Sequence, residues 1–144
     1  MRRPKQVLVF LYKKVKNEYL YCIFLRTSGE WQGVSGGVED DESLVDTAKR
    51  EVLEETGNVI FDIMELSSIT SIPVVDVVGD FRFGDEVYVI PEYSFGAYCG
   101  GDIKLSSEHK DYKWVSYDEA IKFLKYDSNK TALWELNERL SRFE

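Results

Sequence analysis

Two apolar runs near the start of the chain predict a pair of strands. Residues 6–12 and 19–26 are rich in β-branched, aromatic and leucine side chains, and the largely polar residues 13–18 separate them. Runs of this composition at this separation are typical of a β-hairpin.

Residues 29–37 are rich in glycine, and residues 43–56 have a helical pattern. Four glycines in residues 29–37 predict a loop with unusual backbone angles and close approaches. Residues 43–56 carry a helical pattern, with a capping-box pair at Ser43 and Asp46. Gly57 stands where a left-handed C-cap is usual, so we expect the helix to end there.

The rest of the chain is expected to alternate between extended segments and helices. Extended segments are predicted at residues 59–66, 71–78, 93–99 and 111–116, with a strand or a long loop at 81–90. A short helix at 118–124 and a terminal helix at 128–142 follow. This mixture predicts an α/β or α+β sandwich.

Length and charge narrow the class of protein. The chain has 144 residues, which indicates one domain over 1–144. Its 18 Lys+Arg against 26 Asp+Glu give a formal charge of −8, which disfavours nucleic acid and anionic membranes as partners. The longest apolar run, residues 7–12, is far shorter than the ~18 residues of a membrane span.

Cysteine and histidine content narrow the chemistry further. Cys22 and Cys99 lie within apolar runs, which indicates reduced core thiols and a cytoplasmic protein. His109 is the only histidine, which excludes sites built from several histidines. Catalysis is therefore expected to depend on carboxylates.

Acidic residues are concentrated around the predicted helix. Glu51, Glu54 and Glu55 fall within an arc of roughly 100° on one side of it. Like charges at this spacing destabilise a helix by a few tenths of a kcal/mol per pair, so the cluster indicates either a solvated acidic face or a site for Mg²⁺, which prefers carboxylate oxygens. The acidic residues of the segment are Glu39, Asp40, Asp41, Glu42, Asp46, Glu51, Glu54 and Glu55.

The spacing of the polar residues carries a family signature. The chain reads Gly-x5-Glu-x7-Arg-Glu-hydrophobic-x-Glu-Glu-x-Gly, and the matching residues are Gly36, Glu42, Arg50, Glu51, Val52, Glu54, Glu55 and Gly57. This string resembles the Nudix box of the Nudix hydrolases. One position departs from the pattern, because Asn58 stands where a bulky aliphatic residue is usual.

The resemblance implies a fold, a metal site and a reaction. The fold would be a Nudix-type α/β/α sandwich with a mixed sheet, and the box would form a loop-helix-loop. Glu51, Glu54 and Glu55 would hold Mg²⁺, or Mn²⁺ as an alternative, with the carbonyl near Gly36. Arg50 would orient the catalytic carboxylates, and the reaction would hydrolyse a nucleoside diphosphate linked to another moiety.

A narrower resemblance extends beyond the box. Residues 31–39 and 108–114, with Ser128-Asn129, are similar to dihydroneopterin triphosphate pyrophosphohydrolases, which also act on dATP. This similarity places Glu108 with the metal-binding glutamates, where it would serve as a base. The residues expected to contact the substrate are Trp31, Gln32, Tyr93 and Lys113.

The sequence leaves two alternative functions and the oligomeric state undecided. The box is shared with hydrolases of dinucleoside polyphosphates and of oxidised nucleotides, which only a substrate profile separates. A non-catalytic nucleotide-sensing Nudix domain is the third reading, although such domains commonly lose box carboxylates that are all present here. Family dimers are common, so a homodimer is also among the expectations.

Overall fold

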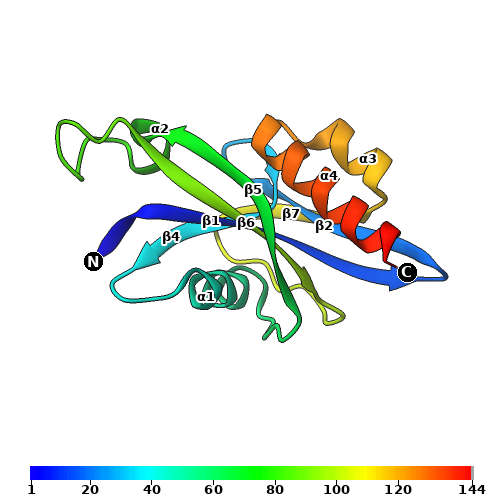
Figure 1. Cartoon of the computed structure of the whole chain (residues 1–144). Coiled ribbons are helices and arrows are strands. Elements are labelled where there is room, and N and C mark those ends of the chain that lie inside the picture. Colours follow the sequence, from blue (N-terminus) through cyan, green and yellow to red (C-terminus); the bar gives the residue numbers. More distant parts are fainter. Residues whose placement is uncertain (144) are drawn as a thin grey trace.

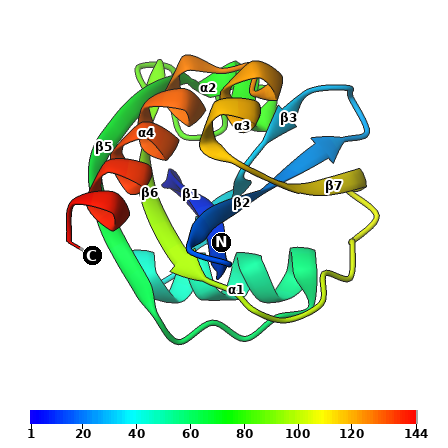
Figure 2. The ribbon, with the colours of Figure 1, turned by 90° about the vertical axis from the view of Figure 1, so that its right-hand side faces the viewer.

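A mixed β-sheet lies between helices on its two faces. The computed structural model describes residues 1–143, with α1 on one face and α3 and α4 on the other (Figures 1 and 2). The elements are β1 (Arg2–Val15), β2 (Glu18–Arg26), β3 (Trp31–Gln32), β4 (Val34–Glu39), α1 (Leu44–Thr56), β5 (Ile63–Pro73), α2 (Val74–Val78), β6 (Val89–Tyr98), β7 (His109–Val115), α3 (Tyr117–Phe123) and α4 (Asp127–Arg142). The predicted α/β/α sandwich is confirmed.

Strand β1 organises the sheet. The strand order is β3-β2-β1-β6-β5, with β4 also paired to β1 and β7 also paired to β2. The first half of β1 runs antiparallel to β4 and its second half antiparallel to β2, whereas β6 runs parallel to it on the other side. Residues of the box segment, on β4, and residues of the much later strand β6 therefore meet around one central strand.

The predicted hairpin is present as β1 and β2. Leu11 pairs with Cys22 and Val15 with Glu18. The connecting residues Lys16 and Asn17 both have positive φ, at 51° and 65°, as the tightest hairpin turns require.

Alternation along β1 supplies two separate cores. Val7, Val9 and Leu11 pack on the α1 side of the sheet, whereas Leu8 and Phe10 pack on the α3 and α4 side. Because both faces are covered, the strand is apolar throughout its middle. Within residues 1–143, no helix is both long and apolar enough to cross a membrane.

Two predictions of local structure were wrong. The glycine-rich stretch is not simply a loop, because residues 34–39 pair with β1 as strand β4. Of its glycines only Gly29 has a positive φ, of 104°. Residues 71–78 are not extended throughout: β5 ends at Pro73, and the valine-rich residues that follow form the short helix α2.

The departure from the box pattern has a local explanation. The Asn58 side-chain amide donates to the carbonyls of Thr56 (3.0 Å) and Asp102 (2.8 Å). It thereby ties the end of the box to the loop before β7, while the nearby Ile60 is buried in the core. The two cysteines, Cys22 and Cys99, are buried and free, as expected.

Candidate active site

Helix α1 is held in place by caps at both ends. The Ser43 hydroxyl accepts a hydrogen bond from the backbone N–H of Asp46 (3.1 Å). Gly57 adopts the left-handed conformation, with φ of 74°, and its N–H donates to the carbonyl of Leu53. Ala48 and Val52 are fully buried against the sheet. The predicted caps are confirmed, and they fix where the acidic side chains of the helix lie.

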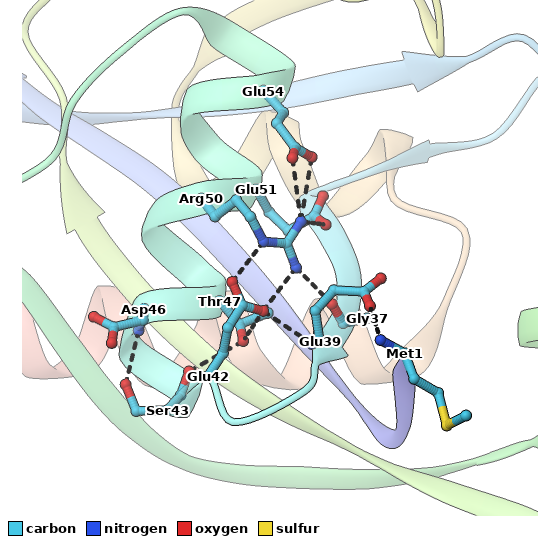
Figure 3. A network of polar contacts seen from close by, with 10 residues as sticks. All are labelled: Met1, Gly37, Glu39, Glu42, Ser43, Asp46, Thr47, Arg50, Glu51 and Glu54. Carbon is cyan, nitrogen blue, oxygen red and sulfur yellow. Dashed lines mark hydrogen bonds and ion pairs between the residues drawn. The ribbon is translucent and has the colours of Figure 1, made fainter.

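Arg50 lies at the centre of a polar network that joins α1 to the preceding loop (Figure 3). Its Nε and Nη2 donate to the two carboxylate oxygens of Glu42, at 2.7 and 2.9 Å. Nη2 also donates to the carbonyl of Gly37 (2.8 Å). The hydrogen bonds from Arg50 lower the pKa of Glu42 to about 2. This paired geometry is the strong form of an arginine–carboxylate contact.

The same guanidinium orients two box glutamates. Nη1 of Arg50 donates to Glu51 (2.9 Å) and to both oxygens of Glu54 (3.3 Å each). Arg50 therefore offsets the repulsion between the carboxylates of Glu51 and Glu54, which are three residues apart on the same helix. The orienting role that the resemblance implies for Arg50 has a geometric basis here.

Glu51 lies against the backbone of Gly36. A Cβ atom at Gly36 would overlap the Glu51 carboxylate, so a residue with a side chain would displace that carboxylate. Burial, together with the neighbouring Glu54 and Glu55 charges, raises the pKa of Glu51 to about 7 against the opposing effect of Arg50. The close approach predicted from the glycines is confirmed. It brings the backbone of strand β4 at Gly36 next to the buried carboxylate of Glu51.

Glu55 faces the other way, toward the loop before β7. Its Oε2 accepts from the Ser106 hydroxyl (2.9 Å) and lies 2.8 Å from Nδ1 of the buried His109. The hydrogen bond with Glu55, followed by burial, raises the pKa of Glu108. Burial alone would raise the pKa of Glu55 too, but its contacts with His109, Glu108 and Ser106 outweigh burial and lower it. Two carboxyl groups in contact are costly unless they share a proton or a cation.

Two of these four carboxylates, Glu51 and Glu108, line a large cleft, whereas Glu54 and Glu55 do not. The cleft has a volume of about 960 Å³. Gly36, Glu51 and Glu108 line one end of it. Gln6, Glu92 and residues at the start of α4, including Asn129, line the remainder. A cavity of this size is adequate for a nucleotide-sized ligand.

The structure brings some of the predicted substrate residues to the cleft and leaves others outside it. Gln32 lines the cleft, and its amide donates to the Ser35 hydroxyl (3.1 Å). Trp31 instead packs edge-on against Phe123, and the Lys113 ammonium lies over both rings.

Tyr93 also lies away from the cleft. It follows Glu92 on β6, and side chains alternate along a strand, so it faces the α1 core while Glu92 faces the cleft. We therefore retain only Gln32 among the four predicted substrate contacts.

The sequence did not indicate Gln6 and Glu92 as cleft residues, and it gave Asn129 only as part of the narrower resemblance. Gln6 on β1 and Glu92 on β6 are buried polar side chains, 9% and 4% exposed. Asn129 accepts a hydrogen bond from the backbone N–H of Gly33 (2.9 Å), which holds the β3–β4 connection against α4. The available signal was a polar residue at an inward-facing strand position, but the sequence alone does not say which strands are neighbours.

The donor set suits a hard cation. The residues predicted to hold the metal, Glu51, Glu54, Glu55 and Glu108 with the backbone at Gly36, would offer carboxylate and carbonyl oxygens. In residues 1–143, no group of three or more Asp, Glu, His or Cys side chains is arranged so that it could hold a metal ion as it stands. An open set of carboxylates fits Mg²⁺, which keeps several waters and bridges protein to phosphate. The buried Glu51 and the contact between Glu55 and Glu108 are sites where such a charge would be stabilising.

Comparison with known proteins gives the class of this protein, a Nudix hydrolase of nucleotide-type substrates. The chain belongs to the Nudix family, because the family model for the NUDIX domain matches residues 2–135.

Three known proteins illustrate the similarity. A crystal structure from Listeria monocytogenes, assigned to the NUDIX hydrolases, is 43% identical, covers 97% of this chain and 96% of its own, and has a TM-score of 0.86. The dihydroneopterin triphosphate diphosphatase of Haemophilus influenzae is 28% identical over 140 residues, covering 92% of this chain and 86% of that protein. The asymmetrical bis(5′-nucleosyl)-tetraphosphatase of Rattus norvegicus is 27% identical over 128 residues, covering 87% of this chain and 84% of that protein.

Proposed function

We propose that this protein hydrolyses a phosphoanhydride bond of a nucleoside, deoxynucleoside or pterin triphosphate in the presence of Mg²⁺, releasing pyrophosphate and the monophosphate. The observation that carries the proposal is the set of glutamates that contact Arg50 and His109, together with the cleft of about 960 Å³ that Glu51 and Glu108 line. The similarity to the dihydroneopterin triphosphate diphosphatase of Haemophilus influenzae supports the pyrophosphate-releasing form of the reaction.

The side chains divide the chemical work. Glu51, Glu54, Glu55 and Glu108, with the carbonyl at Gly36, are the residues that would hold the metal ions. When bound, these ions neutralise phosphate charge and lower the pKa of a water molecule. Arg50 orients Glu51 and Glu54, and Glu54 or Glu108 accepts the proton of the attacking water.

Two further features belong to the proposal. Mn²⁺ is expected to replace Mg²⁺, because both prefer carboxylate and water oxygens. The buried free thiols of Cys22 and Cys99 support a reducing, cytoplasmic location.

The test is pyrophosphate release with Mg²⁺ from dihydroneopterin triphosphate, the four common dNTPs and an oxidised dGTP. Glu54→Gln removes a charge from a half-exposed side chain and should lower kcat by about 100-fold or more, with the circular dichroism spectrum unchanged. Asp46→Asn changes an exposed carboxylate about two turns before Glu54 on the same helix; it is the matched control and should retain activity. Wild-type rates in Glu54→Gln would refute the assignment of the site.

A second candidate is a dinucleoside polyphosphate hydrolase. The similarity to the rat tetraphosphatase, over 87% of this chain, favours it specifically. Diadenosine tetraphosphate therefore belongs in the same substrate panel. Faster turnover of this compound than of any triphosphate would replace the leading proposal, whereas binding without any turnover would favour a nucleotide sensor.

A further inference from the structure

A buried polar pair forms part of the cleft away from the box glutamates. Gln6 on β1 and Glu92 on β6 are direct partners in the parallel pairing of these strands. Both side chains line the cleft and both are at least nine-tenths buried. The next residue of β1 on the same face, Leu8, packs in the apolar core. Burying a carboxylate such as that of Glu92 costs free energy, which indicates that Glu92 has a functional role.

Hydrogen bonds fix the orientation of the pair. Nη2 of Arg2 donates to Oε1 of Gln6 (2.9 Å), and Nε2 of Gln6 donates to Oε2 of Glu92 (2.6 Å). An arginine only donates, so the Gln6 oxygen must face Arg2 and its amide nitrogen must face Glu92. The Arg2 guanidinium itself lies against Gly37, next to the site of Gly36 and Glu51.

Glu92 is left with unused accepting capacity. Within residues 1–143, Gln6 is its one hydrogen-bond donor. An ionised carboxylate has about four acceptor sites. Buried polar groups are nearly always satisfied, and Glu92 lines the cleft, where a ligand can reach its remaining acceptor sites. The complementary ligand group is therefore a pair of adjacent N–H donors.

Heterocycles differ in whether they present such a pair. The 2-amino-4-oxo pyrimidine ring, shared by guanine and pterin, places a ring N–H beside an exocyclic amino group. Adenine places an amino group beside a ring nitrogen that only accepts. That nitrogen would point its lone pair at the carboxylate of Glu92, so two hydrogen-bond acceptors would face each other and adenine would bind less tightly.

We propose that Glu92, held by Gln6 and Arg2, reads the amino-oxo edge of the substrate's heterocycle and selects guanine or pterin triphosphates over adenine triphosphates. The proposal rests on the function proposed above and names the substrate class of the same site. A glutamine at position 92 presents one donor and one acceptor, which is the complement of the adenine edge.

The experiment compares kcat/KM for dGTP, dITP and dATP in the wild type, in Glu92→Gln and in Glu65→Gln. Glu65 is an exposed acid on the neighbouring strand β5, so it controls for loss of charge. We expect the wild type to prefer dGTP over dATP by at least about tenfold, with dITP, which lacks the amino group, between them. Glu92→Gln should reduce the dGTP-to-dATP ratio by about tenfold or more, and Glu65→Gln should leave it unchanged.

Binding of dGMP and dAMP without metal, measured by calorimetry, separates the two proposals. Tighter binding of dGMP, lost in Glu92→Gln, supports heterocycle selection even if no substrate is turned over. Turnover with an unchanged ratio in Glu92→Gln, or a wild-type preference for adenine, overturns the inference while leaving the hydrolase proposal intact. If Glu92→Gln does not fold, the wild-type order of dGTP, dITP and dATP decides alone.

Discussion

The Glu51 carboxylate occupies the space that a side chain at Gly36 would need. The contact joins the middle of α1 to strand β4, and Arg50 holds the same carboxylate from the other side at 2.9 Å. A glycine is required here by space and not by backbone angle, because Gly36 is absent from the residues of positive φ. The site therefore depends on one missing methyl group.

Gly36→Ala should displace Glu51 and abolish most activity without unfolding the protein. The added Cβ meets a carboxylate fixed by Arg50, so the metal-binding end must rearrange. We expect the Mg²⁺ concentration for half-maximal activity to rise by about tenfold or more. Activity titrations against Mg²⁺ measure this directly, with circular dichroism as the check on folding.

Gly37→Ala is the matched control for that change. Its Cβ meets the guanidinium of Arg2, which would have to leave Gln6, so this change disturbs the Gln6–Glu92 pair and not the Glu51 carboxylate. The Mg²⁺ requirement should then stay within about twofold of the wild type, because ligand geometry is untouched. Equal effects of the two substitutions would contradict the specific role given to the Gly36–Glu51 contact.

We expect His109 to affect the Mg²⁺ requirement by positioning Glu55. Its Nδ1 lies 2.8 Å from Oε2 of Glu55, and both side chains are almost fully buried. His109→Phe should raise the Mg²⁺ requirement by about 10- to 100-fold, because the groups that orient metal ligands typically contribute this much. His109→Asn, whose amide can donate toward Glu55, should restore part of the affinity. A change in kcat with no change in Mg²⁺ dependence would show that His109 does not act by positioning Glu55.

The box helix was predictable because its signals are local. Ser43, Asp46 and Gly57 mark its ends within the sequence itself, and the structure shows each cap in place. The spacing of the glutamates relative to Arg50 likewise lies within one helix. Such short-range patterns do not depend on knowing which distant segments are neighbours.

The Gln6–Glu92 pair in the cleft could not be predicted in the same way. Gln6 and Glu92 are 86 positions apart and meet only because β1 and β6 run parallel. The glycine-rich strand β4 was missed because glycine disfavours strands unless a partner, here β1, supplies the hydrogen bonds. Helix α2 was missed because its valines favour strands, and Pro73 and Gly79 set its limits instead.

The stability of the protein should fall in acid through the Glu42–Arg50 pair. The hydrogen bonds from Arg50 hold the pKa of Glu42 at about 2, below its ordinary value of 4.5. A carboxylate with a lowered pKa stabilises the fold fully above pH 4.5, and this contribution is lost as the pH falls through about 2. Glu42→Gln should cost about 1 to 3 kcal/mol at pH 7 and less than about half as much at pH 3.

Urea unfolding of the wild type and Glu42→Gln at pH 7, 5 and 3 measures this difference. Asp41→Asn, an exposed acid in the same loop, controls for the general effect of charge. A difference between wild type and Glu42→Gln that is the same at all three pH values would argue against an ionic contribution.

Glu135 should stabilise an irregular point in β5. The pairing of β5 with β6 shifts register between Glu65 and Ile69, which leaves backbone N–H groups without a strand partner. The Glu135 carboxylate on α4 accepts from the N–H groups of Ser67 (2.6 Å) and Ser68 (2.8 Å).

Removing that carboxylate should therefore destabilise the protein and loosen β5 locally. Glu135→Ala leaves both N–H groups without their acceptor, at a cost of about 1 to 3 kcal/mol. Glu138→Ala, three residues further along the same helix, should cost less, because it removes an acid without removing these bonds. Amide hydrogen exchange at Ser67 and Ser68 should become faster in Glu135→Ala only. If the two variants unfold at the same urea concentration and show the same amide exchange at Ser67 and Ser68, then strand pairing alone holds the irregular point in β5, and Glu135 is only a surface charge.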